Sequence, residues 1–177
     1  MPPPIVDELL LHAQVHRARF PGPHPVEPQK KLAIVACMDS RIDIFSVFGL
    51  GVGEAHVIRN AGGLITDDVL RSLVLSQRAL GTRAIVLLHH TDCGLMKIRE
   101  REFREAIVAD TGLEPPYEFG AFTDVDESVR RGIARVREHP FLPHRDVVRG
   151  FVYEVETGVV REVDPAPAAQ TAARRPG

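Results

Sequence analysis

The sequence has few cysteines, no long apolar run and little net charge, and these absences exclude several classes of protein. With two cysteines in 177 residues, the chain cannot form a disulfide framework. No apolar run approaches the ~20 residues that a membrane-spanning helix needs. The net charge is -2 and the pI is about 6.4, so the chain lacks the basic field that attracts nucleic acid or membrane surfaces. We expect no nucleic acid partner and no membrane partner.

The chain also begins without a recognisable targeting segment. Met-Pro-Pro-Pro-Ile lacks the basic start and the apolar core of a secretory signal peptide. We therefore expect a cytoplasmic protein, in a reducing compartment that keeps Cys37 and Cys93 as thiols. Two thiols in a cytosolic protein of this size indicate a metal site or reactive cysteines before a structural disulfide.

What the sequence does contain is an alternation of short apolar runs and helical patterns. Continuous apolar runs predict buried parallel strands at 32–36, 55–58 and 84–88. Apolar residues at helical spacing predict helices at about 4–19, 44–50, 67–80, 95–109 and 123–138. Two further strands are expected at 147–155 and 159–163, joined by a tight turn at Thr157-Gly158.

This alternation predicts an α/β fold with a mostly parallel central β-sheet, flanking helices and an antiparallel edge strand. Residues 1–163 are expected to form a single zinc-binding domain, since their length suffices for one hydrophobic core. Residues 164–177 are rich in Pro, Ala, Gln, Thr and Arg, which predicts a disordered tail.

Candidate metal ligands follow two of the predicted strands. Cys37 comes after the first strand, and His90 and Cys93 come after the third. If these strands are neighbours, the three side chains meet at the carboxyl edge of the sheet, where α/β folds bind ligands. Two thiolates and one imidazole suit zinc, and three protein ligands leave a fourth position for water or substrate. We expect one Zn²⁺ per chain and chemistry at its bound water.

Three motifs together resemble the signature of the β-class carbonic anhydrases. They are Cys37-Met-Asp39-Ser-Arg41, Arg59-Asn60-Ala61-Gly62 and His90-Thr-Asp-Cys93-Gly. The resemblance extends from about residue 32 to residue 163, and the short chain is similar to the compact branch found in archaea and bacteria. His89 is the one serious competitor of His90 as a ligand, and the His-x-x-Cys spacing of the family selects His90.

The resemblance implies a function and a site. It implies a carbonate dehydratase, a lyase that reversibly hydrates CO2 to bicarbonate and a proton by zinc-bound hydroxide. The residues matching Cys37, His90 and Cys93 bind zinc in that family, and those matching Asp39 and Arg41 form an outer pair beside it. It also implies a homodimer or a higher even oligomer, with the active-site clefts at the subunit interface.

Asp39 and Arg41 are the candidate catalytic residues. Asp39 is expected to accept a hydrogen bond from the hydroxide, and Arg41 to keep Asp39 ionised and oriented. The alternative is an ordinary surface ion pair beside a turn. If Asp39 left Arg41, its carboxylate could occupy the fourth zinc position and close the site. Gly62 and Gly63 are candidates for presenting backbone N–H groups to substrate or to Asp39, or they simply form a tight turn.

Other functions fit parts of the same sequence. A hydrolase of carbonyl sulfide or carbon disulfide could use the same metal ligands, because zinc-bound hydroxide attacks those carbons in the same way. A redox protein could instead join Cys37 and Cys93 in a reversible disulfide, although the two are not in a Cys-x-x-Cys motif. A binding or sensor protein that kept zinc and lost turnover is a third alternative.

Overall fold

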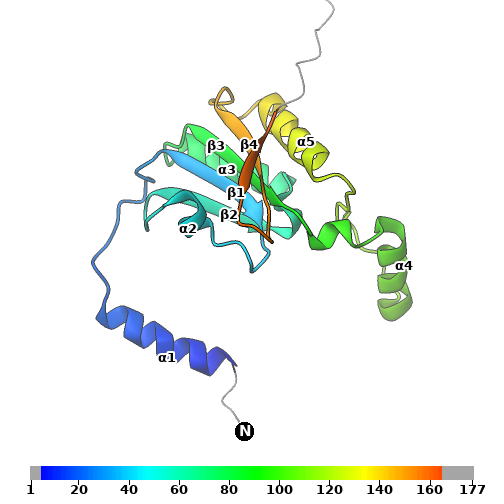
Figure 1. Ribbon diagram of the computed structural model, residues 1–177, viewed down its shortest axis with the longest axis horizontal. Helices are drawn as coiled ribbons and strands as arrows, with labels where there is room; N and C mark the ends of the chain where they lie inside the picture. Colours follow the sequence, from blue (N-terminus) through cyan, green and yellow to red (C-terminus); the bar gives the residue numbers. More distant parts are fainter. Residues whose placement is uncertain (1–4, 165–177) are drawn as a thin grey trace, which may run out of the picture.

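A five-stranded sheet forms the centre of the molecule. The computed structural model describes residues 5–164, and the sheet has the strand order β2-β1-β3-β4-β5 (Figure 1). Four strands are parallel, and β5 pairs antiparallel with β4 at the edge. The strands are β1 (Leu32–Cys37), β2 (Ala55–Asn60), β3 (Ala84–His90), β4 (Val148–Tyr153) and β5 (Val160–Val163). The predicted fold class is therefore confirmed.

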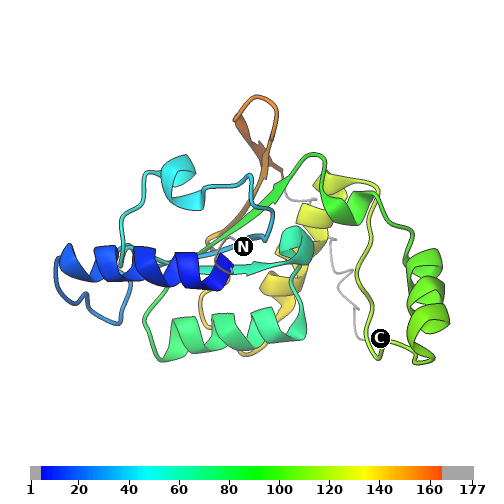
Figure 2. The ribbon, with the colours of Figure 1, turned by 90° about the horizontal axis from the view of Figure 1, so that it is seen from below.

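Among residues 5–164, five α-helices accompany these strands, and three of them cover the two faces of the sheet. They are α1 (Ile5–Ala18), α2 (Ile44–Phe48), α3 (Asp67–Arg78), α4 (Glu100–Thr111) and α5 (Val125–Glu138), with two 3₁₀ turns, η1 (Ala61–Gly63) and η2 (Gly94–Met96). In Figure 2, α2 lies on one side of the sheet, and α3 and α5 lie on the other. Side-chain caps start three of these helices, because Asp43 accepts from the N–H of Ser46, Thr66 from that of Val69 and Asp124 from that of Asp126.

The sheet separates two apolar layers, because successive side chains of a strand point to opposite faces. Ala33 and Val35 of β1 belong to the layer beneath α3 and α5, together with Leu73 and Ile133. Ile34 and Ala36 belong to the opposite layer, which includes Ile44 of α2 and also contains Cys37 and Cys93. The cysteine thiols are thus part of a hydrophobic layer on the α2 side.

The strand order brings the candidate ligands together. β1 lies between β2 and β3, with Ala36 opposite Leu88 and Cys37 opposite Asn60. Because β1 and β3 are parallel neighbours, Cys37 and His90 lie at the same edge of the sheet. The condition on which the predicted site depended, that the first and third strands are neighbours, is therefore met.

Three predicted boundaries were wrong close to the site. The first and third strands were expected to end at residues 36 and 88, but they end at Cys37 and His90. The helix expected from Leu95 begins only at Glu100, after Arg99 in extended conformation. Leu95 is 8% exposed and packs in the apolar layer of Cys93 and Phe122, so this burial interrupts the helical pattern.

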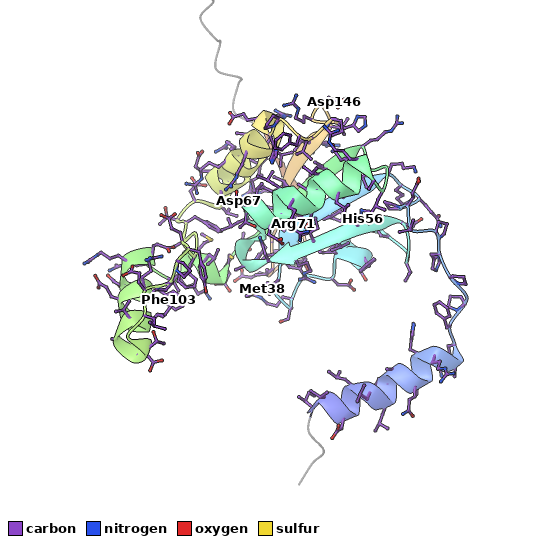
Figure 3. The ribbon with its side chains drawn as sticks, turned by 180° about the vertical axis from the view of Figure 1, so that it is seen from behind. Met38, His56, Asp67, Arg71, Phe103 and Asp146 are labelled. Carbon is purple, nitrogen blue, oxygen red and sulfur yellow. The ribbon has the colours of Figure 1, made fainter. Side chains whose placement is uncertain are left out.

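Two helices extend away from the sheet. The N-terminal helix predicted at 4–19 is present as α1, but none of its residues is buried (Figure 1). Helix α4 lies at the opposite end of the molecule, where Figure 3 marks Phe103. None of the described helices has the length and hydrophobicity needed to span a membrane. The tail predicted at 164–177 lies, apart from its first residue, outside the described residues.

Candidate metal centre

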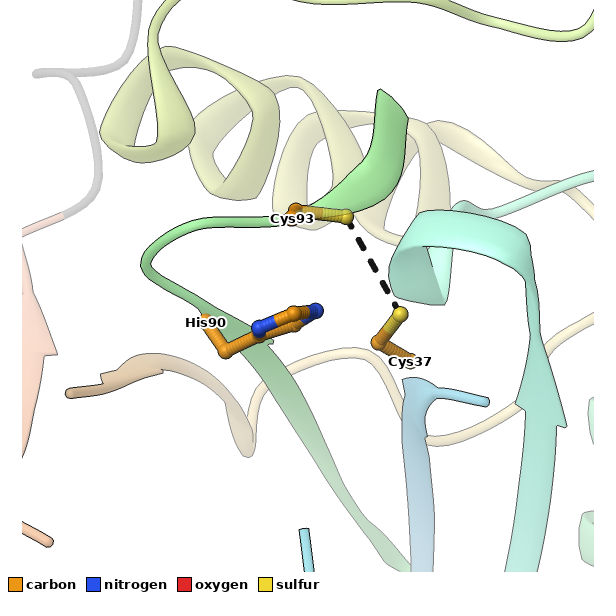
Figure 4. A group of neighbouring side chains, drawn as sticks. All are labelled: Cys37, His90 and Cys93. Atoms are coloured by element: carbon orange, nitrogen blue, oxygen red, sulfur yellow. Dashed lines mark hydrogen bonds between the residues drawn. The ribbon is translucent and has the colours of Figure 1, made fainter. Parts of the chain in front are cut away.

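Cys37, His90 and Cys93 form one buried cluster. One ligand atom from each residue lies within 4.8 Å of the others, and the three side chains point toward a common space (Figure 4). Cys37 comes from the end of β1, His90 from the end of β3, and Cys93 precedes η2. The structure therefore brings together the three residues that the sequence selected as ligands.

The donor atoms of this cluster fit a zinc ion. The sulfurs of Cys37 and Cys93 lie 4.0 Å apart, whereas two sulfurs in a tetrahedral zinc site lie about 3.8 Å apart. His90 Nδ1 lies 2.8 Å from the carbonyl oxygen of Thr91, which requires the hydrogen on Nδ1. His90 Nε2 is buried and has no hydrogen-bond partner among residues 5–164. Its lone pair is therefore available to a metal.

The two thiols are hydrogen-bonded to each other, with their sulfurs 4.0 Å apart. This hydrogen bond is the main reason that the pKa of Cys37 is lowered to about 4. Burial opposes this shift, while His90 and the backbone N–H groups of Asp39 and Gly62 add to it. The same hydrogen bond and burial raise the pKa of Cys93. A metal that binds both thiolates must displace the remaining proton.

Gly62 and Gly63 form a turn in which Gly63 packs against the backbone of Cys37 and Gly62 packs against Leu95. Both have left-handed backbones, with φ of 75° and 68°. A Cβ atom on Gly63 would lie 2.9 Å from the backbone nitrogen of Cys37, and one on Gly62 would lie 2.5 Å from Leu95 Cδ1. The N–H of Gly62 donates toward the Cys37 sulfur. The two glycines therefore form a tight turn that also brings their backbone close to Cys37. That their N–H groups contact substrate or Asp39 stays a prediction.

Asp39 and Arg41 form a two-pronged ion pair beside the cluster. Arg41 Nε donates to Asp39 Oδ1 at 2.9 Å, and Nη2 donates to Oδ2 at 2.7 Å. These bonds are the main cause of the lowered pKa of Asp39. Asp39 Oδ2 lies 3.8 Å from His90 Nε2. The Asp39 carboxylate is thus ionised and paired with Arg41. It also lies next to His90 Nε2, the atom that is available to a metal.

Arg59 is a residue of the site to which sequence reasoning gave no role. Its Nε donates to the carbonyl oxygen of Cys37 at 2.9 Å, and its Nη2 donates to that of Asp39 at 2.6 Å. The N–H of Met38 also donates to the carbonyl oxygen of Asn60 at 2.8 Å. Strand β2 therefore fixes the backbone between Cys37 and Asp39. The Arg59-Asn60-Ala61-Gly62 motif drew attention to Arg59, but the sequence did not indicate that Arg59 contacts the backbone of Cys37 and Asp39.

His89 lies beside the site without belonging to it. Its Nε2 donates to the carbonyl oxygen of Gly63 at 3.1 Å, and burial lowers its pKa to about 4. His89 is therefore neutral and holds the η1 turn against the sheet. Of the two adjacent histidines, it is His90 that lies in the cluster with both cysteines.

Comparison with known proteins agrees with this geometry. A family model described as carbonic anhydrase matches residues 32–160. Beta-carbonic anhydrase 1 of Mycobacterium tuberculosis is 46% identical over 161 residues, which are 91% of this chain and 99% of the relative. The chain belongs to the β-carbonic anhydrase family. The resemblance seen in the three sequence motifs is thereby confirmed.

The chain is also similar to a carbon disulfide hydrolase in sequence and to a carbonic anhydrase of known structure. A carbon disulfide hydrolase of Acidithiobacillus thiooxidans is 37% identical over 153 residues, covering 75% of this chain and 76% of the relative. The crystal structure of the carbonic anhydrase from Streptococcus mutans aligns with a TM-score of 0.87 at 42% identity. That alignment covers 93% of this chain and 100% of the other.

Proposed function

We propose that this chain is a zinc-dependent carbonate dehydratase that reversibly hydrates CO2 to bicarbonate and a proton. The observation that carries the proposal is the buried cluster of Cys37, His90 and Cys93, with an unpartnered Nε2 on His90 and the Asp39 carboxylate beside it. Membership of the family and the 46% identity to a named β-carbonic anhydrase support it.

The chain's own residues divide the work of the reaction. Zinc held by the three ligands would lower the pKa of a bound water molecule to about 7. Asp39 Oδ2, 3.8 Å from His90 Nε2, is placed to accept a hydrogen bond from the attacking water and to orient its lone pair toward the carbon of CO2. Arg41 keeps Asp39 ionised and turned toward that water. A C–O bond forms between the water oxygen and the carbon of CO2, the π bond of one C=O group opens to place the negative charge on the oxygen of that group, and the proton lost by the water passes to solvent.

A second candidate is hydrolysis of carbonyl sulfide or carbon disulfide. The similarity to carbon disulfide hydrolases favours it, because those relatives are 37% and 34% identical over about three quarters of this chain. The ligand cluster does not discriminate between the two substrate classes. Turnover of CO2, carbonyl sulfide and carbon disulfide by one zinc-loaded preparation decides between them.

We also propose a homodimer, or a higher even oligomer, in the cytoplasm. Helix α1 exposes Ile5, Leu9 and Leu10 to solvent at 66%, 58% and 58%. Several exposed apolar side chains on one helix are typical of an interaction site. A second copy of the chain covering α1 agrees with the subunit interface that the family resemblance implies.

The test combines zinc analysis with stopped-flow CO2 hydration across pH. We expect one zinc per chain in protein purified under reducing conditions, and at least a ~100-fold lower kcat after Asp39→Ala or Cys37→Ala. Cys37→Ala should also lose zinc, whereas Asp39→Ala should keep it. The matched control is Asp68→Asn, which removes an exposed ion pair with Arg71 on α3. Metal-free, fully active protein, or a Cys37–Cys93 disulfide without zinc, contradicts the proposal and favours the redox alternative.

A further inference from the structure

The guanidinium of Arg41 lies between two carboxylates. Its Nε and Nη2 groups donate to Asp39, as described above. On the other side, Nη1 donates to Asp92 Oδ2 at 2.8 Å, and Nη2 donates to the carbonyl oxygen of Asp92 at 3.1 Å. Hydrogen bonds to Asp39 along one edge of the guanidinium and to Asp92 along another therefore fix its orientation.

The local backbone explains how Asp92 reaches Arg41. Asp92 lies in the turn between His90 and Cys93 and has φ of 57°, a left-handed conformation that aspartate tolerates better than most residues. Lys97 binds the remaining oxygen, with Nζ 2.7 Å from Asp92 Oδ1. Lys97 thereby offsets the charge of Asp92 without occupying the oxygen that Arg41 uses.

The second carboxylate matters because Arg41 is not buried. Its side chain is 44% exposed, and an exposed arginine paired with a single carboxylate loses much of the gain to side-chain freedom. Hydrogen bonds to Asp92 restrict that freedom before Asp39 is engaged. The guanidinium then presents its Nε and Nη2 groups to Asp39, whose Oδ1 also accepts from the backbone N–H of Arg41 at 2.9 Å.

We propose that Asp92 is a positioning residue, which holds Arg41 in the orientation that directs the Asp39 carboxylate toward the metal cluster. This inference rests on the proposed function for its effect on turnover, but the contact between Asp92 and Arg41 can be tested without it. A purely structural role for Asp92, shaping the turn that carries His90 and Cys93, makes different predictions.

The first experiment compares Asp92→Asn with wild type in CO2 hydration. Asparagine keeps the size of the side chain and tolerates the left-handed backbone, so we expect full zinc content. We expect kcat to fall about two- to fivefold, the range that corresponds to a partly exposed charge pair. In the Arg41→Ala background, Asp92→Asn should cause no further loss, because its effect passes through Arg41. An equal loss in both backgrounds, or loss of zinc, assigns Asp92 to the turn and overturns the proposal.

The second experiment observes Arg41 directly and needs no turnover. The Nε–Hε signal of Arg41 in ¹⁵N-resolved NMR spectra is assigned by its absence in Arg41→Ala. We expect its hydrogen exchange with water to be faster in Asp92→Asn than in wild type and unchanged in the control Asp68→Asn. Unchanged exchange in Asp92→Asn overturns the proposal. An inactive wild type with the expected change in exchange would refute the proposed function but leave the positioning contact intact.

Discussion

The Nδ1 atom of His90 bonds the carbonyl oxygen of the next residue, Thr91, at 2.8 Å. This bond holds the hydrogen on Nδ1 and leaves the buried Nε2 as an acceptor without a partner in the described structure. An unpaired buried nitrogen costs free energy, and a metal bound at Nε2 would remove that cost. Metal removal is therefore the most direct test of the proposed site.

Removing zinc should lower the stability of the protein and replacing it should restore it. At a free zinc concentration 1,000 times the Kd, binding contributes about 4 kcal/mol to the free energy of unfolding. We expect a lower Tm after chelation under reducing conditions and recovery with added Zn²⁺, but not with Mg²⁺, which prefers oxygen ligands. A Tm that is independent of zinc would show that the cluster of Cys37, His90 and Cys93 holds no metal.

Replacing Gly63 by alanine should disturb the site through the backbone of Cys37. The new Cβ would lie 2.9 Å from the Cys37 nitrogen, in addition to the cost of a left-handed alanine. We expect a loss of stability of more than ~2 kcal/mol and weaker zinc binding, measured by urea unfolding and metal titration.

Gly112 provides the matched control for this substitution. It has φ of 73° and ends α4, with no atom within 4 Å of an added Cβ. Gly112→Ala should cost only the ~1–2 kcal/mol of backbone strain and leave zinc affinity unchanged. Equal effects at both positions would mean that the close approach to Cys37 has no particular importance.

The exposed face of α1 should hold the oligomer together. Leu10→Glu places a charge on an apolar surface, so we expect dimers to dissociate to monomers in analytical ultracentrifugation at micromolar concentration. Gln14→Glu changes the charge of the same helix at a polar position and should leave the dimer intact. A wild-type monomer, or an unchanged dimer after Leu10→Glu, would contradict this role of α1.

Acid should weaken an ion pair that links α5 to the edge strand β5. Arg161 donates hydrogen bonds to both carboxylate oxygens of Asp126. These bonds are the main cause of the lowered pKa of Asp126. Because the folded pKa lies below the unfolded value of about 3.9, the stabilisation is present above that value and is lost as the pH falls further.

Asp126→Asn isolates this contribution. The side chain of Asp126 is 29% exposed and that of Arg161 is 38% exposed. We therefore expect the free energy of unfolding of wild type at pH 7 to be about 0.5–1 kcal/mol higher than that of the variant. Urea unfolding at pH 7 and at pH 3 measures whether this difference narrows, and zinc loss in acid affects both proteins alike. A difference that grows in acid would contradict the assigned direction of the pKa shift.

Local patterns in the sequence were enough for the main elements and for selecting three residues that the fold brings together. The apolar runs that became β1 and β3 predicted buried parallel strands, and the soft donors of Cys37, His90 and Cys93 predicted a metal site. The helix start at Leu95 was wrong, because helical periodicity does not reveal that Leu95 packs against Phe122 instead. Boundaries next to the site depend on such distant contacts.

By itself, the sequence determined which side chains could bind a soft metal and which segments could be buried strands, since both follow from residue chemistry and local spacing. Only the tertiary structure decided that Arg59 fixes the backbone of Cys37 and that Asp92 meets Arg41, 51 residues away in the chain. The physical reason is that these contacts join segments whose proximity depends on the order of the strands. That order results from packing of the whole sheet, so even the motif that contains Arg59 does not reveal which residues Arg59 contacts.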